Sequence, residues 1–214
     1  MNSGNRNLSY NTFTGILTGD GYITKLPRTF QFGIVVDAIK DKEYLENYVK
    51  PLVEKLFEVK TRITFRNGAL NLIFYSKNIG EYITSLGFPV GKKGNLPIID
   101  FVKQNEKLWP YFLRGYFDTV GCIFWDQRKI YTKPYPRITF TTISESLAND
   151  LKNCLEKLGF SIYIIKKNRI TTLAKRGYSI TYDIEFYGHK HLKMWNSLVG
   201  SSNPTKRLVL LTPR

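Results

Sequence analysis

The chain has 214 residues, of which 43% are hydrophobic and 14% aromatic, a composition that excludes an intrinsically disordered protein. Its 32 lysines and arginines outnumber 17 acidic residues and give a formal net charge of +15. The positive charges repel one another unless a polyanion neutralises them. Nucleic acid is therefore the expected partner, with a basic surface that binds nothing as the alternative.

Two similar segments stand at the same place in the two halves of the chain. Residues 13–21 read FTGILTGDG and residues 113–121 read LRGYFDTVG, so the first and the last glycines of the two segments align. Each segment precedes a similar series of expected elements. We therefore expect an internal duplication in which each half opens on a helix.

The first half is expected to continue with four strands and two further helices. An apolar stripe at helical spacing predicts a helix over residues 42–57, with Asp41 as its N-cap and a kink or break at Pro51. Asn67 and Gly68 give the strongest short signal for a hairpin turn. The expected elements are strands 22–28 and 29–36, helix 42–57, strands 60–66 and 69–76, and a closing helix 77–86.

The second half is expected to repeat this order. Ser144 is the predicted N-cap of a helix that stops at Gly159, and a basic loop over residues 168–177 joins the last two strands. A short helix is expected between Pro97 and Pro110, before this half begins. The expected elements are strands 122–128 and 136–143, helix 145–158, strands 160–167 and 178–186, and a closing helix 189–198.

Each half thus has the order α-β-β-α-β-β-α, which predicts an α+β fold of two pseudo-symmetric halves. The halves span residues 1–95 and 110–214, and residues 96–109 link them. Helices on one face of an antiparallel sheet leave the other face free, and polar and apolar side chains do alternate along residues 61–66. An ordinary solvated sheet face is the alternative. Both halves are basic, so both are expected to contact the polyanion.

The paired segments and the order of elements resemble the single-chain, two-repeat LAGLIDADG homing endonucleases from Phe13 to about Arg207. The resemblance implies two antiparallel sheets that form a saddle-shaped DNA-binding face, with the motif helices packed at the central interface. Gly15, Gly19 and Gly115 fit that packing, because glycine inside a helix costs roughly 1 kcal/mol relative to alanine and is tolerated where two backbones approach closely.

In that family, the acidic residue before the last glycine of each motif binds a divalent metal, here expected to be Mg²⁺. Asp20 fills this position in the first motif, whereas Val120 fills it in the second and cannot bind a metal. Asp118 lies two positions earlier, roughly 200° around the helix, so we expect it to be a hydrogen-bonded residue, bonded to the other half, rather than a relocated ligand. The residues expected around the metal are Asp20, Gly19 and Thr119.

Lys93 and Lys206 follow the two closing helices, and the resemblance places them near the two active centres as catalytic cations. A contact with phosphate or solvent is the equal alternative for each. Side chains of the sheets are expected to contact DNA bases or phosphates. The candidates are Lys25, Arg28, Gln31, Arg62, Arg66 and Asn71 in the first half, and Gln127, Arg128, Arg137, Lys166, Arg169, Lys175 and Arg176 in the second.

The resulting hypothesis is a monomeric, intron-encoded, site-specific endonuclease for double-stranded DNA. Because Val120 replaces an acid, double-strand cleavage is expected to be weak or absent, with nicking from the side of Asp20. A second hypothesis is a binder that does not cleave, either a degenerate endonuclease that acts as a regulator or an intron maturase that binds RNA. A third is a basic structural protein without sequence preference.

The sequence also bears on location. No apolar run reaches the ~20 residues of a membrane helix, and the polar start of the chain gives no sign of secretion. Cys122 and Cys154 show no paired spacing and are expected to be reduced. We therefore expect an intracellular protein without a membrane partner, in the cytoplasm of a prokaryote or, as the alternative, in an organelle.

Overall fold

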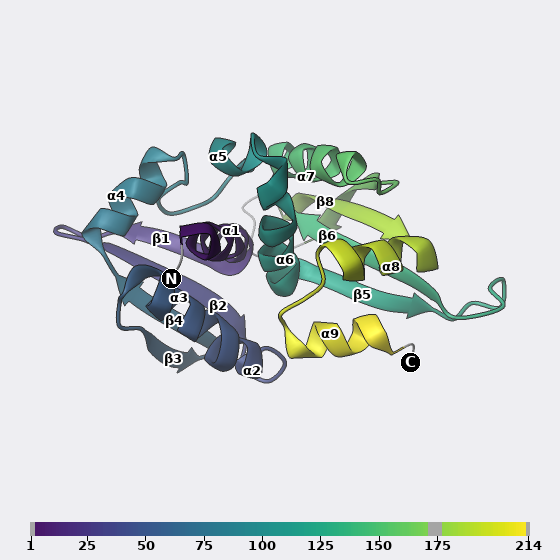
Figure 1. Cartoon of the computed structure of the whole chain (residues 1–214), viewed down its shortest axis with the longest axis horizontal. Helices are drawn as coiled ribbons and strands as arrows, with labels where there is room; N and C mark the ends of the chain where they lie inside the picture. Colours follow the sequence, from purple (N-terminus) through teal and green to yellow (C-terminus); the bar gives the residue numbers. More distant parts are fainter. Residues whose placement is uncertain (1–2, 171–176, 213–214) are drawn as a thin grey trace.

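The computed structural model describes residues 3–170 and 177–212 of the chain. Two four-stranded antiparallel sheets lie side by side, and two long helices run between them (Figure 1). The strand orders are β1-β2-β4-β3 and β5-β6-β8-β7, so both sheets have the same topology. The predicted α+β fold of two similar halves is confirmed. No helix in the described ranges is long and apolar enough to cross a membrane.

The first half follows the predicted order of elements. The predicted helix 42–57 is continuous but contains a π-helical turn just before Pro51, which has no N–H for the regular bonding pattern. Asp41 occupies the predicted N-cap position, but its side chain makes no capping hydrogen bond. The elements are α1 (Ser3–Asp20), β1 (Gly21–Lys25), β2 (Phe30–Asp37), α2 (Lys42–Tyr44), η1 (Leu45–Val49), α3 (Lys50–Phe57), β3 (Arg62–Arg66), β4 (Ala69–Tyr75) and α4 (Lys77–Ser85).

The connection and the second half contain one helix that the sequence did not reveal, α9, whose N-cap is Asn203. Ser144 caps its helix as predicted, with Oγ accepting from the Leu147 N–H at 3.1 Å, and Gly159 follows that helix at φ 93°. The elements are α5 (Asp100–Lys103), η2 (Glu106–Leu108), α6 (Trp109–Val120), β5 (Gly121–Asp126), β6 (Tyr135–Thr142), α7 (Glu145–Lys157), β7 (Tyr163–Ile170), β8 (Tyr178–Tyr187), α8 (His189–Leu198) and α9 (Pro204–Leu211).

Strand β7 begins and ends three residues later than the predicted strand 160–167. Phe160 instead donates its N–H to the carbonyl of Leu155 and packs into the core as part of the turn after α7. Strand β7 then stays paired with β8 as far as Ile170, opposite Tyr178. The basic segment predicted as a loop is therefore partly strand.

Each half has its own apolar core, and α1 and α6 join the two. A Cβ atom placed on Gly15 would lie 2.1 Å from the carbonyl oxygen of Phe112, and one on Gly115 would lie 2.0 Å from that of Thr12. The two backbones therefore touch at these glycines, as the motif predicted. Outside this contact, α1 buries Phe13 in the first core and α6 buries Phe117 in the second.

We predict that Gly115→Ala lowers the free energy of unfolding by about 3 kcal/mol or more, because the added methyl group overlaps backbone and the helices must separate. Urea unfolding measures the change. The matched control is Gly87→Ala, where no atom lies within 4 Å of the new Cβ and only the backbone strain of φ 93°, about 1 kcal/mol, is added. Equal losses for the two variants would contradict the close contact.

Candidate active site

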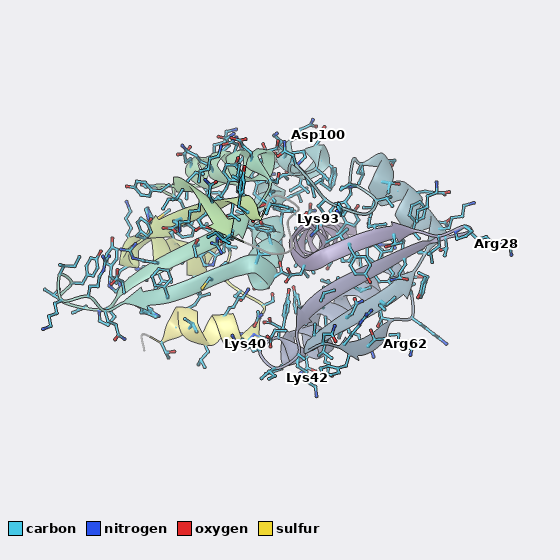
Figure 2. The ribbon with its side chains drawn as sticks, turned by 180° about the vertical axis from the view of Figure 1, so that it is seen from behind. Arg28, Lys40, Lys42, Arg62, Lys93 and Asp100 are labelled. Atoms are coloured by element: carbon cyan, nitrogen blue, oxygen red, sulfur yellow. The ribbon has the colours of Figure 1, made fainter. Side chains whose placement is uncertain are left out.

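The C-terminal ends of α1 and α6 meet at the centre of the molecule. A Cβ atom on Gly19 would lie 2.0 Å from Thr119 Oγ1 and 3.3 Å from Val120 Cγ1. Asp20 is therefore next to the end of α6, and Val120 next to the end of α1. Seen from the strand side, Lys93 lies between the two sheets at this centre (Figure 2).

Both predicted lysines bind the ends of these helices. Lys93 Nζ donates to the carbonyl oxygens of Leu17 at 3.2 Å, Thr18 at 2.8 Å, and also Gly19. Lys206 Nζ donates to the carbonyl oxygens of Phe117 and Thr119, both at 2.8 Å. Each ammonium group thus satisfies carbonyls that the last helical turn leaves unpaired and opposes the negative end of the helix dipole. A catalytic role and a contact with phosphate or solvent both stay predictions for these lysines.

Asp20 is partly buried and interacts with the charges of Lys93 and Lys206. Burial raises the pKa of Asp20, the charges of Lys93 and Lys206 oppose this shift, and the nearby Asp41 adds to it. Burial also lowers the pKa of Lys93 to about 8, against the effect of Asp20. Burial lowers the pKa of Lys206 as well. The centre therefore holds charged groups of both signs in a region with little water.

Asp118 has a structural role, as its position on the helix predicted. Its side chain is 1% exposed and accepts hydrogen bonds from Ser201 Oγ at 2.5 Å and from the Ser202 N–H at 2.9 Å. Burial raises the pKa of Asp118 to about 6 in spite of these bonds. Its partners lie in the second half itself, so the expected bond to the other half is wrong. Asp118 holds the loop that positions Lys206.

The loop that carries Lys93 and the loop that leads into α9, the helix that carries Lys206, also connect each half to the other. In the first loop, Asn95 Oδ1 accepts from the Ser146 N–H at 3.0 Å, at the start of α7. In the second loop, Asn203 Nδ2 donates to Asp41 Oδ1 at 2.7 Å, at the start of α2. This bond explains why Asp41 does not cap its own helix. The only sign of these two contacts in the sequence was that an asparagine, Asn95 or Asn203, stands close to each lysine.

The surroundings of Asp20 and Val120 differ. A pocket of about 270 Å³ lies beside Val120, bounded by Lys93, Thr142, Ser144 and Leu147 among others. On the Asp20 side, the residue that corresponds to Leu147, the third residue of α7, is Tyr44, the third residue of α2. Tyr44 is 1% exposed. Burial and the carboxylates of Asp118, Asp41 and Asp20 raise the pKa of Tyr44 well above its usual value. One centre is thus filled by charged and polar groups, and the other is a hollow without a carboxylate.

The donor atoms at the centre fit a divalent metal only in part. Within the described residues, no three His, Cys, Asp or Glu side chains are arranged to hold a metal ion. Mg²⁺ commonly takes one or two protein carboxylates together with phosphate oxygens and water, which the Asp20 carboxylate suits. At the predicted metal positions Gly19 and Thr119, the carbonyls already accept from Lys93 and Lys206, and the Thr119 hydroxyl donates to the Tyr116 carbonyl at 2.8 Å. The chemistry therefore favours Asp20, and the other two stay predictions.

The open face of the first sheet carries most of the predicted DNA contacts of that half. Gln31, Arg62, Arg66 and Asn71 alternate with the buried residues of their strands and so lie on the face away from the helices. Tyr22 Oη accepts from Gln31 Nε2 at 3.1 Å and from Asn71 Nδ2 at 2.9 Å, which fixes both amides.

Two further candidates of the first half lie at the end of the β1–β2 hairpin. Arg28 is in the turn at its tip, far from the centre (Figure 2). Lys25 is paired with Phe30, whose side chain is buried against the core. Lys25 therefore has the orientation of the helix-covered face, which is a less direct position for a base contact.

In the second sheet, Arg137 and Arg169 lie on the open face, and Gln127 and Arg128 follow β5. Lys166 is paired with the buried Tyr182 and so has the orientation of the helix-covered face. Its neighbour Lys167, which the sequence analysis missed, lies on the open face. The strict alternation of a paired strand is the signal that would have separated the two. The candidates Lys175 and Arg176 lie outside the described residues.

Comparison with known proteins gives one family model, one curated relative and several solved structures. Residues 111–200 match the model of the LAGLIDADG-like domain. An uncharacterized protein of Methanocaldococcus jannaschii, MJ0314, is 27% identical over 167 residues, which are 72% of this chain and 57% of that protein. The chain thus spans little more than half the length of this relative.

Solved structures of homing endonucleases have the same fold over nearly the whole chain. A mesophilic variant of I-DmoI matches with a TM-score of 0.63 and 15% identity, covering 97% of this chain and 98% of that one. I-DmoI in complex with DNA and Mn matches at 0.60 and 14%, covering 91% and 96%. I-WcaI bound to its DNA recognition sequence matches at 0.57 and 18%, covering 97% and 87%. The chain therefore has the two-repeat LAGLIDADG fold, with a LAGLIDADG-like domain at residues 111–200.

Proposed function

We propose that this chain is a site-specific DNA endonuclease that binds duplex DNA across both open sheet faces and cuts one strand from the side of Asp20. The observation that carries the proposal is the unequal pair of helix ends. Asp20 provides a carboxylate that interacts with the charges of two lysines, whereas Val120 stands beside a hollow without a carboxylate. Similar structures bound to DNA, together with the net charge of +15, support a duplex as the substrate. Since one chain holds both halves, we propose a monomer.

The reaction would be hydrolysis of a phosphodiester. A water oxygen forms a bond to phosphorus while the bond to one ester oxygen breaks, and the water proton passes to solvent as the leaving oxygen is protonated. Asp20 would hold a divalent ion, most simply Mg²⁺, which when bound supplies positive charge for the phosphate and lowers the pKa of water. Similar structures contain Mn, Mg or Ca.

The lysines would contribute as positioning residues. Their Nζ atoms bind helix-end carbonyls, and their charges reduce the repulsion between Asp20 and an approaching phosphate. In this reading they fix the ends of α1 and α6 and keep the centre from becoming strongly negative. Asp20 would act on the reacting atoms through the divalent ion that it holds.

A binder that does not cleave is the second candidate, and the lysine bonds to the Gly19 and Thr119 carbonyls favour it. Those bonds neutralise the helix ends without a metal. Such a protein would act as a regulator on DNA or would bind structured intron RNA. Competition between duplex DNA and structured RNA for the intact chain separates these two partners.

We predict that the chain nicks a supercoiled plasmid carrying its selected site and that Asp20→Asn abolishes nicking while binding stays within about three-fold. The amide keeps the size of the side chain but removes the charge that holds the ion. Gel separation of nicked and linear plasmid in Mg²⁺ measures the result, and gel shift in Ca²⁺ measures binding. If the unchanged chain never cuts but binds the site, the binder is the correct reading.

We predict further that Val120→Asp adds the second cut, so that linear plasmid appears where only nicked plasmid formed before. The hollow beside Val120 leaves room for a carboxylate, and the cationic side chain of Lys93 lines the same hollow. The control is Val120→Asn, which has the same size and no charge and should only nick. Linear product from the unchanged chain would contradict the assigned role of Val120.

The position of the DNA has a test that does not depend on cleavage. Cys122 is exposed on the open face of β5, opposite Thr139, whereas Cys154 is buried and burial raises its pKa to about 12. We predict that a thiol reagent at pH 8 labels Cys122 alone and that the selected duplex slows this labelling about ten-fold or more. A cysteine introduced on the helix side, in a Cys122→Ser, Ser85→Cys chain, should label equally with and without duplex. Unchanged labelling of Cys122 would place the DNA elsewhere.

A further inference from the structure

The open face of the second sheet contains an aspartate that holds two arginines, an arrangement unexpected on a surface that binds a polyanion. Asp126, at the end of β5, is 8% exposed in its side chain, and both Arg128 and Arg137 form ion pairs with it. On the first sheet, Arg62 and Arg66 lie at exposed positions of β3, and no carboxylate of the described residues pairs with them. A carboxylate here weakens the attraction of this surface for phosphate. We therefore look for its role in the orientation that it gives to the two arginines.

Arg137 is held on three sides. Its Nε donates to Asp126 Oδ2 at 3.0 Å, and its Nη2 lies 3.0 Å from the same oxygen. Its guanidinium carbon lies 4.8 Å from the ring centre of Tyr187 and 5.9 Å from that of Phe124. The side chain is 21% exposed. Aromatic rings on both sides and the carboxylate behind leave the group one direction of approach, from the open face.

The groups left free on Arg137 form a matching pair of donors. Asp126 takes the edge formed by Nε and Nη2, so the N–H groups at the other end, on Nη1 and Nη2, are available. The hydroxyl of Tyr131, at 3.4 Å from Nη2, is too far to compete strongly. Two parallel N–H donors fit the O6 and N7 acceptors of guanine in the major groove, and no other base offers that pair.

We propose that Arg137 reads one guanine in the second half of the target and that Asp126 is the positioning residue that makes this reading specific. The proposal rests on the duplex binding proposed above. Arg137 lies three residues along β6 from Phe140, which is paired with Gly121 at the end of α6. This spacing is about 10 Å, or about three base pairs, from the centre. The guanine therefore lies inside the second half-site.

Arg128 also pairs with Asp126, but its surroundings differ from those of Arg137. Its Nε and Nη2 both bind Asp126, at 3.0 and 2.7 Å, yet its side chain is 61% exposed and has one aromatic neighbour, Tyr131. The hydrogen bond from Arg128 and the charges of both arginines lower the pKa of Asp126 to about 2, so the acid stays ionised at neutral pH. Arg128 is the matched control, because Arg128→Lys disturbs an ion pair with the same acid at a side chain that is largely exposed rather than enclosed by two rings.

The test is selection of duplexes from a random library in Ca²⁺ with the full chain, followed by gel shift on the selected site. For the unchanged chain we expect a guanine at one position of the second half-site. In Arg137→Lys that preference should fall about ten-fold, with the other positions unchanged, because lysine cannot make the paired contact. Arg128→Lys should weaken all sequences evenly. Asp126→Asn should lower the guanine preference while retaining binding.

A change in the DNA tests the same contact between Arg137 and guanine with the unchanged chain, so the result does not depend on whether a variant folds. Replacing the selected guanine by 7-deazaguanine removes N7 and should weaken the unchanged chain about ten-fold, but should not affect Arg137→Lys. A guanine preference that survives Arg137→Lys, or that ignores 7-deazaguanine, overturns this inference while leaving the proposed function intact. An unchanged chain that selects no site at all contradicts the proposed function, and this inference with it.

Discussion

The contact between α1 and α6 is the constraint on which the rest of the structure depends. At Gly15 and Gly115 each backbone meets a carbonyl of the other helix, so neither position has room for a side chain. This close crossing brings the ends of both helices to one place and sets the two cores on either side of it. It also fixes the two sheets relative to each other, because each sheet begins directly after its helix, at Gly21 and Gly121. A wider crossing would separate the centres and the sheet faces together.

Two helix ends in contact create an electrostatic problem, because the negative ends of two dipoles point at the same region and an aspartate stands there. Lys93 and Lys206 resolve it from opposite sides, one for each helix. The loop that carries Lys93 and the N-cap of the helix that carries Lys206 are themselves fixed to the opposite half, through Asn95 and Asn203. The charge balance of the centre and the alignment of the halves are therefore one arrangement. A substitution in either loop acts on both, which is why the lysines are better understood as positioning groups than as free cations.

The sequence was informative where a pattern is local or repeated. The caps at Ser144 and Gly159 depend on neighbours a few residues away, and the glycines of the motif stand at matching places in the two halves; these features were predicted correctly. It was uninformative where the partner is distant. Asp41 looks like an N-cap, but Asn203, which is 162 positions away, takes its carboxylate. The carbonyls bound by Lys93 are about 75 positions away. Strand β7 was misplaced because burial of Phe160 in the turn resembles the start of a strand. In each case tertiary contacts decided between local alternatives of similar energy.

The two sheets share a topology but place their charges differently, and this difference follows from the acids rather than from the number of cations. On the first open face, the Tyr22 hydroxyl orients amides, and the arginines of β3 stay free to follow a phosphate backbone. On the second, Asp126 and Asp183 each hold two cations, and both acids are nearly buried. Free cations favour affinity, since a mobile side chain can meet a phosphate at many positions. Fixed cations favour discrimination, since a donor with one direction accepts few partners. A duplication that began with equal halves can thus divide positioning and reading between them without any change of fold.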